Sequence, residues 1–161
     1  MKKLLPLAAL ALLSAPAHAV ITHSTDAMTD VEWTHWMVES DKGSSQLVMG
    51  ARCIAGDPNS TKFLIMNKDG GISSNYRNWS WIDVRWNDGK IWNQNWTGSS
   101  DGFGAFSTTG FDFLQAVHDN DTVRLGFTDR RGRNRVGKFD LKAHRKEIKQ
   151  MLRICKGSET H

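Results

Sequence analysis

The sequence predicts a mainly β fold: an antiparallel β-sandwich of about eight strands, with one short internal helix and a C-terminal amphipathic helix. Short apolar runs separated by turn residues follow one another from residue 31 to residue 140, as expected for strands that pair with their neighbours along the chain. Glycine-rich segments break these runs at residues 69–71 and 98–102. The chain has 161 residues, which suffice for one domain with one core and exclude a multidomain enzyme.

Residues 1–19 have the pattern of a secretory signal peptide. Lys2 and Lys3 provide the positive start, residues 4–16 form an apolar stretch too short to span a bilayer comfortably, and residues 17–19 read Ala-His-Ala, an A-x-A cleavage site. We expect cleavage after Ala19 and a soluble mature chain, residues 20–161, that forms a single β-sandwich domain in the periplasm or outside the cell. No later segment approaches the roughly 18 apolar residues of a spanning helix, so no transmembrane segment is expected there.

The strands are expected where apolar and polar residues alternate. The predicted ranges are 31–38, 46–53, 62–67, 79–87, 90–96, 103–107, 122–128 and 135–140. The dipeptide Asp88-Gly89 separates two tryptophan-bearing strands and is well suited to the positive φ values of a two-residue hairpin. That hairpin places Asn87 opposite Lys90.

Two segments follow the helical period instead. The first, residues 111–118, is about two turns long and gathers three apolar residues on one face: Phe113, Leu114 and Val117. The second follows Asp140, which suits an N-cap position. Its apolar residues recur at i, i+3, i+4 and i+7: Ile148, Met151, Leu152 and Cys155. We expect this stripe to pack against the sheet.

The two cysteines, Cys53 and Cys155, are expected to form a disulfide, because both belong to the exported part of the chain. The two cysteines are 102 positions apart. A disulfide that closes a loop of this length stabilises a fold by up to about 4 to 5 kcal/mol in the chain-entropy model. The alternative is a zinc site, which normally needs close ligand pairs, and neither cysteine has a cysteine or histidine at such a spacing. We favour the disulfide and expect neither a metal nor a cofactor.

The charge is unevenly distributed. Residues 20–121 hold seven basic and thirteen acidic residues, whereas residues 124–156 hold twelve basic and three acidic ones. Four arginines crowd a predicted hairpin loop: Arg130, Arg131, Arg133 and Arg135. This basic end suits a phospholipid surface, an acidic protein face or an anionic glycan, and the alternative is a solvated face that balances the acidic half. Nucleic acid is not expected, because the leader exports the chain and no nucleic-acid module is visible.

No motif indicates catalysis. Residues 98–102 match the G-x-S-x-G nucleophile elbow, but a glycine-interrupted strand follows them where the elbow requires a helix. The histidines form no close metal pair, and no pair of carboxylates stands out for glycoside hydrolysis. We therefore expect no catalytic residue and no enzyme activity.

The seven tryptophans are the most unusual feature of the composition, and five of them fall between residues 79 and 96. Strand alternation places Trp79 and Trp81 on one face together with Asp83 and Arg85. The opposite face of that strand is apolar and should point to the core through Ile82, Val84 and Trp86.

In the next strand, Trp92 and Trp96 share a face. Either this pair or the pair of Trp79 and Trp81 is a candidate platform for sugar rings or for a partner's side chains. Burial in the core is the alternative, because a domain of this size stabilises itself by burying aromatic side chains.

A longer pattern runs through the chain. Its parts, in order, are Trp33, residues 47–53 and 62–65, Val84 with Arg85, Trp96 with Ser99, Ser100 and Asp101, a short helix around Phe113, residues 122–125 and 139–141, and a last helix ending at Cys155. This order resembles the periplasmic accessory proteins of type VI secretion, the TagO/VasI-like family. The resemblance implies a β-sandwich with a terminal helix pinned by the cysteines and a non-enzymatic task in the envelope. Where that family tends to have R-x-D, this chain has Arg85-Trp86-Asn87.

The sequence thus predicts an exported, soluble, non-enzymatic periplasmic accessory or binding protein, associated with a type VI secretion system. A cell-wall glycan-binding module or an inhibitor of a wall hydrolase is the alternative. The expected partner is an envelope protein or an anionic surface, with peptidoglycan as the second candidate. The residues expected to bind it are Arg130, Arg131, Arg133, Arg135, Trp79, Trp81 and Arg85.

Overall fold

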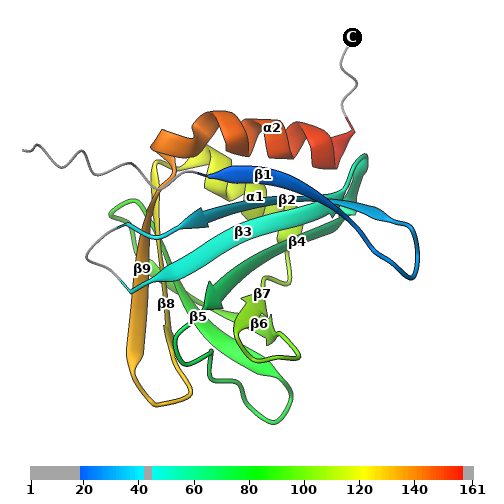
Figure 1. Ribbon diagram of the computed structural model, residues 1–161. Coiled ribbons are helices and arrows are strands. Elements are labelled where there is room, and N and C mark those ends of the chain that lie inside the picture. Colours follow the sequence, from blue (N-terminus) through cyan, green and yellow to red (C-terminus); the bar gives the residue numbers. More distant parts are fainter. Residues whose placement is uncertain (1–18, 42–44, 158–161) are drawn as a thin grey trace, which may run out of the picture.

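The computed structural model describes residues 19–41 and 45–157. Apart from Ala19, the predicted signal peptide lies outside these residues. Nine antiparallel strands form one sheet with the order β1-β2-β3-β4-β7-β6-β5-β8-β9 (Figure 1). They are β1 (Val20–Thr25), β2 (Glu32–Glu39), β3 (Leu47–Ile54), β4 (Asp57–Asn67), β5 (Trp79–Trp86), β6 (Ile91–Gly98), β7 (Gly104–Phe106), β8 (Thr122–Thr128) and β9 (Asn134–Asp140).

The predicted mainly β, antiparallel fold with a short internal helix and a C-terminal helix is confirmed. The sheet bends, so that β1 to β4 and β5 to β9 form two halves that run in different directions (Figure 1). One apolar cluster joins both halves, with Trp36 and Phe63 from the first and Ile82 and Leu125 from the second.

β1 was not expected from the sequence. It pairs with β2 and places Ile21 opposite Trp36, but its other side chains are exposed. Because only one residue of this strand packs against the core, its sequence lacks the apolar alternation by which a strand is recognised.

The edge of β9 is covered by the chain that enters β3. The backbone N–H of Asp41 donates to the Lys138 carbonyl (2.7 Å), and that of Ser45 donates to the Val136 carbonyl (3.0 Å). Gly137 lies against Leu47, whose Cδ1 would be 2.9 Å from a Cβ added to the glycine. The two halves of the sheet therefore touch at this edge as well as through the core.

The internal helix α1 (Gly110–Asp119) fits between the two halves. Its predicted apolar face is confirmed, with Phe113, Leu114 and Val117 buried. The ring of Phe113 lies 4.6 Å from that of Phe63, 5.0 Å from that of Trp96 and 5.1 Å from that of Trp86. These aromatic contacts bring β4, β5, β6 and α1 together.

The C-terminal helix α2 (Arg145–Lys156) packs against the strands of the first half and runs alongside β1 (Figure 1). The predicted apolar stripe is buried as expected: Ile148, Met151, Leu152 and Cys155. The helix begins later than the sequence suggested, after a 3-10 turn (Lys142–His144). Asp140 caps that turn, because its Oδ1 accepts the backbone N–H of Ala143 (3.2 Å).

The predicted disulfide is present and joins β3 to α2. Cys53 and Cys155 are bonded with a Cα–Cα distance of 5.6 Å. α2 ends beside them at Gly157, whose φ of 71° lies in the left-handed region. A Cβ on Gly157 would lie 2.6 Å from the Cα of Gly56, so the loop between β3 and β4 packs directly on this end of the helix.

The predicted register of the β5–β6 hairpin is wrong by one position. Arg85 pairs with Ile91, and it is Asn87, with a φ of 49°, that takes the left-handed conformation. The cause lies outside the turn. The Asn87 side chain accepts the backbone N–H groups of Asp121 (3.0 Å) and Thr122 (3.1 Å), which ties the turn to the start of β8.

Candidate functional site

The outward side of β5 carries the predicted aromatic pair. Ile82 and Val84 are fully buried, whereas Trp79 and Trp81 are exposed, so the predicted alternation in this strand is confirmed. β5 is hydrogen-bonded to β6 on one side and to β8 on the other, and β8 to β9. The outward residues of these strands enclose a shallow hollow, and we call six of them the Trp81 face: Trp81, Asp83, Asn93, Gly126, Thr128 and Val136.

The hollow in the Trp81 face has a volume of about 310 Å³. Its floor is Gly126, which lies opposite Asp83 on β5 and opposite Val136 on β9. A Cβ on Gly126 would meet Val136 at 3.5 Å and Asp83 at 3.6 Å, both ordinary contacts. Packing does not demand a glycine here, and its missing side chain leaves the hollow open.

Polar side chains line this hollow. Asn93 donates from Nδ2 to Asp83 Oδ1 (2.7 Å), and Thr128 Oγ1 donates to Asn134 Oδ1 (3.3 Å). A carboxylate accepts more than one hydrogen bond, so Asp83 keeps capacity for a ligand hydroxyl. Next to them, the ring of Trp81 is 58% exposed. The arrangement offers a flat apolar surface beside hydrogen-bonding groups.

The other predicted aromatic pair is not a platform. Trp92 is 61% exposed, but Trp96 is fully buried. The Trp96 ring packs edge-on against Phe63 and Phe113, and its Nε1 donates to Gln94 Oε1 (2.9 Å). Trp96 is therefore a core residue, which was the alternative interpretation of the tryptophans. Trp79 and Trp81 are exposed on the outward side of the sheet.

Basic residues lie at one margin of the Trp81 face. Arg85 is opposite Arg124 on β8, which in turn is opposite Lys138 on β9. Arg85 donates to the carbonyls of Gly89 (2.9 Å, from Nε) and Asp88 (3.3 Å, from Nη2), so it holds the β5–β6 turn. Within residues 19–41 and 45–157, neither Arg124 nor Lys138 forms an ion pair.

The predicted arginine loop is tied down by two aspartates. The side chain of Asp129 is buried and accepts the Nε groups of Arg133 (2.8 Å) and Arg135 (3.0 Å). It also accepts the backbone N–H groups of Arg131 and Arg133 (both 2.9 Å). Asp69, from the loop after β4, binds Arg135 Nη2 at 2.6 Å and lies within 3.6 Å of Arg131 and Arg133.

These contacts set the pKa values of both carboxyl groups. Burial alone would raise the pKa of Asp129, but the hydrogen bonds from Arg133 and Arg135 outweigh it and hold that pKa well below its usual range. The hydrogen bond from Arg135 lowers the pKa of Asp69, against a smaller effect of desolvation. Both aspartates therefore stay charged at neutral pH.

Arg130, the fourth arginine of the predicted loop, also has a structural contact. Its guanidinium occupies the space that a side chain on Gly102 would take, and it lies against Gly71. It thereby packs together the loops that follow β4 and β6. Arg131, whose side chain is 63% exposed, is the arginine with the most exposed ion pair in this cluster.

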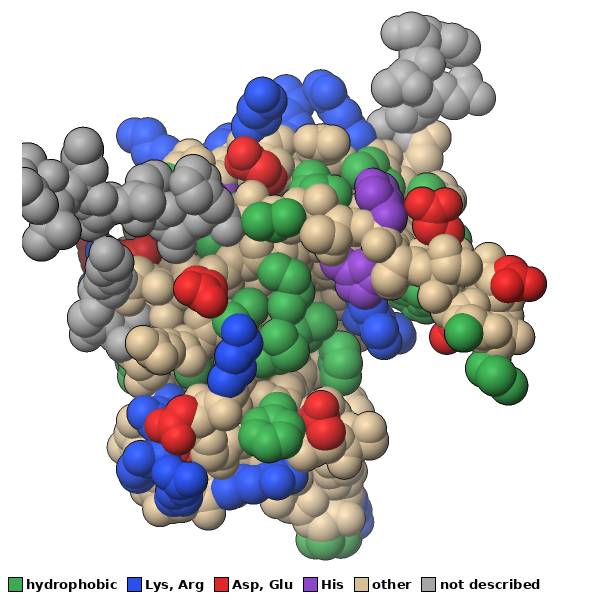
Figure 2. Space-filling model, viewed as in Figure 1, with side chains coloured by type: hydrophobic (Ala, Val, Ile, Leu, Met, Phe, Trp, Pro, Cys, Tyr) green, Lys and Arg blue, Asp and Glu red, His purple; other side chains and the backbone are tan. Residues whose placement is uncertain are grey.

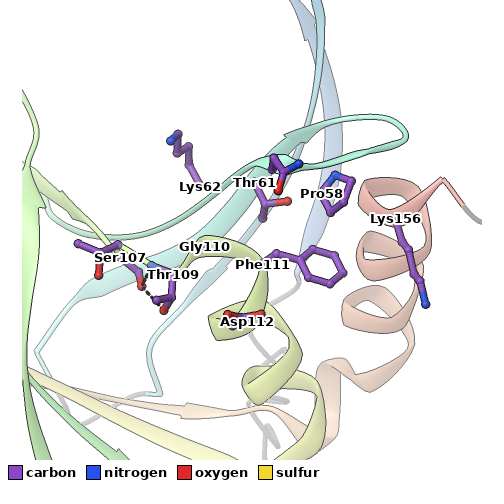
Figure 3. Close-up of a pocket in the computed structure, with 11 residues that line it drawn as sticks. Pro58, Thr61, Lys62, Ser107, Thr109, Gly110, Phe111, Asp112 and Lys156 are labelled. Atoms are coloured by element: carbon purple, nitrogen blue, oxygen red, sulfur yellow. Dashed lines mark hydrogen bonds between the residues drawn. The ribbon is translucent and has the colours of Figure 1, made fainter.

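A recess of about 470 Å³ lies between β4, the segment that enters α1 and the last residue of α2 (Figure 3). Its polar groups include the hydroxyls of Ser107 and Thr109, the carboxylate of Asp112 and the ammonium of Lys156. Lys62 points away from the other side chains in Figure 3. No histidine or cysteine belongs to this lining.

Strand alternation had already placed Asp83 on the same face as Trp81, but the sequence missed Asn93, Gly126 and Val136, because their position beside Trp81 depends on which strands pair. Among the described residues, no group of three or more histidine, cysteine, aspartate or glutamate side chains is arranged to hold a metal ion. Neither helix of that same part of the chain is long and apolar enough to cross a bilayer.

Comparison with protein-family models, with curated proteins and with solved structures finds no match to this chain.

Proposed function

We propose that this chain is an exported, non-enzymatic binding protein of the cell envelope and that the Trp81 face takes a cell-wall glycan. The observation that carries the proposal is the exposed ring of Trp81 beside the hollow over Gly126. An exposed indole offers a flat apolar surface to the C–H face of a sugar ring. Asp83 and Asn93 supply acceptors and donors for sugar hydroxyls at the same place.

The charges at the margin support an anionic wall polymer over a neutral one. Arg124 and Lys138 lie side by side without an acidic partner among the described residues. Peptidoglycan combines sugar rings with the carboxylates of its stem peptides, so one polymer can engage both the indole and this basic pair. An accessory role in a type VI secretion system, which the family resemblance implies, is compatible with holding the wall.

Co-sedimentation with purified peptidoglycan sacculi tests this proposal. The wild-type chain should pellet with the sacculi, and Trp81→Ala should weaken binding by about tenfold or more, as for an aromatic anchor of an interface. Trp92→Ala is the matched control, because Trp92 is equally exposed but lies outside the Trp81 face. Pelleting that is the same for all three chains, or no pelleting at all, would refute the proposal.

An envelope protein that docks on the arginine loop is the second candidate. The exposed side chain of Arg131 favours it, since Arg133 and Arg135 are engaged by the buried Asp129. In a pull-down from periplasmic and membrane fractions, Arg131→Glu should release the partner. Lys149→Glu on the exposed side of α2 is the control for the change in net charge, and a partner released by both variants would be held by general electrostatics only.

A further inference from the structure

A second surface lies on the first half of the sheet and on β7, the strand that adjoins it. The outward residues of β2, β3, β4 and β7 form it, and we call it the Arg52 face: Trp33, His35, Arg52, Lys62 and Phe106, with the apolar residues Met37, Val48, Leu64 and Met66 beside them. His35, Arg52 and Lys62 lie directly opposite one another on three adjacent strands.

Arg52 is held in place by two aromatic rings. Its guanidinium carbon lies 4.9 Å from the centre of the Trp33 ring and 5.7 Å from that of Phe106. Cation–π contacts of this kind fix the direction of the fork without using its N–H donors. The Nε atom is buried and has no hydrogen-bond partner among the described residues. The guanidinium of Arg52 is thus oriented, and its Nε donor is not satisfied.

The positive charge of this row is not neutralised. Neither Arg52 nor Lys62 forms an ion pair in the part of the chain that the structure describes. Like charges directly opposite each other on neighbouring strands destabilise a sheet. Burial, and then the charge of Arg52, lower the pKa of the adjacent His35. The fold thus keeps an arrangement that costs stability, as proteins do where a ligand supplies the missing charge.

The rest of the Arg52 face is apolar, although it points outward. Val48 and Leu64 are less than 10% exposed, and the side chain of Met37 lies flat over Gly50. Figure 2 shows this apolar area in the middle of the face, with histidine, basic and acidic side chains around it. Antiparallel sheets usually turn polar residues to water on their solvated side. An apolar area with a charged margin, basic at the end where Arg52 and Lys62 lie, is the composition of a protein-binding surface.

We propose that the Arg52 face docks an acidic segment of a partner protein, with a carboxylate bound between Arg52 and Lys62 and apolar side chains covering Met37 and Met66. Charge complementarity selects this occupant, since a planar carboxylate fits the oriented guanidinium fork in two parallel hydrogen bonds. A lipid surface is the weaker match. Recognition of anionic lipids relies on clusters of four to eight basic residues, whereas the described part of this face has Arg52, Lys62 and, near Met66, Lys68, together with the acidic Glu39.

Fluorescence anisotropy with two synthetic peptides tests the proposal. The first is a labelled twelve-residue peptide that alternates glutamate with leucine and valine, and the second has glutamine at every glutamate position. The acidic peptide should bind at least about tenfold tighter than its amide counterpart, because its hydrogen bonds involve charged groups. Arg52→Gln should weaken binding of the acidic peptide about tenfold, and Lys62→Gln should weaken it severalfold.

Lys149→Gln is the matched control, because it removes the same charge from the exposed side of α2. Lys62→Gln should also raise the melting temperature or leave it unchanged, which separates lost binding from lost folding. Equal binding of both peptides, no binding at millimolar concentration, or an unchanged affinity of Arg52→Gln would overturn the proposal. So would Arg52-dependent binding to phosphatidylglycerol vesicles in place of the peptide. The outcome is independent of the sacculus experiment, which concerns the other half of the sheet.

Discussion

Gly126 on β8 lies directly opposite Asp83 on β5. Because Gly126 has no side chain, the hollow of the Trp81 face stays open at this position. Neither residue makes this feature alone. Asp83 supplies an acceptor, Gly126 supplies the space, and the exposed indole of Trp81 supplies the flat wall beside them. Binding and stability can therefore be separated by substitutions at Gly126.

Filling the hollow should abolish glycan binding without unfolding the protein. The backbone at Gly126 is not left-handed, and a Cβ there makes ordinary contacts, so Gly126→Ala should keep or slightly raise stability, by up to about 1 kcal/mol. Gly126→Leu should lose sacculus binding because its side chain occupies the hollow. Thermal unfolding and co-sedimentation measure the two effects. Binding by Gly126→Leu at the wild-type level would show that the hollow takes no ligand.

The disulfide should carry a large share of the stability. Removing the bond between Cys53 and Cys155 with the double change to alanine should cost about 2–5 kcal/mol, because it releases a long loop in the unfolded chain. Urea unfolding of the oxidised wild type and of the variant measures this difference. Similar unfolding midpoints in the two proteins would contradict the expectation, and the mass of the wild type, two hydrogens below the dithiol, confirms that the bond was present.

The buried Asp129 should make stability depend on pH. Its pKa is lowered in the folded protein, so its contribution is present above the usual carboxyl pKa of about 4 and is lost as the pH falls through the folded value. Between pH 6 and pH 2 the free energy of unfolding should fall less steeply for Asp129→Asn than for the wild type. Parallel curves for the two proteins would show that Asp129 contributes nothing to the acid limb.

Gly157 at the end of α2 and Gly132 in the β8–β9 loop form a matched pair of test positions for the packing of that helix end. Both have a positive φ, 71° and 75°, but only Gly157 would place a new Cβ against another backbone, that of Gly56. Gly132→Ala should cost about 1 kcal/mol from the left-handed conformation alone. Gly157→Ala should cost clearly more, because the β3–β4 loop must move away from the helix. Equal losses in chemical unfolding would mean that this packing is unimportant.

Local patterns predicted much of the fold. The stripe that ends at Cys155 repeats every three or four residues, and the alternation of buried and exposed residues in β5 repeats every two, so both can be read from neighbouring positions. The hairpin register could not be read in this way. It is set by Asn87, whose side chain binds the start of β8, more than thirty residues away in the sequence.

The candidate sites depended still more on distant contacts. The charge of the loop that contains Arg135 indicated a partner surface, but the structure brings Asp69 and Asp129 to it, 66 and six residues away. The position of Gly126 opposite Asp83, in the hollow that Trp81 also lines, follows from the pairing of β5 with β8, which is not its neighbour in sequence. Residue types alone give no sign of such pairings, because every strand of a sheet presents the same backbone groups.

The most direct test of the glycan-binding face is an NMR titration of the isotopically labelled protein with soluble muropeptides, followed through the tryptophan indole N–H and backbone amide signals. The indole signal of Trp81 and the amide of Gly126 should shift together and saturate with one dissociation constant, while the indole signal of Trp92 stays in place. Saturating shifts confined to other residues, with the signals of Trp81 and Gly126 unmoved, would contradict the assignment of this face.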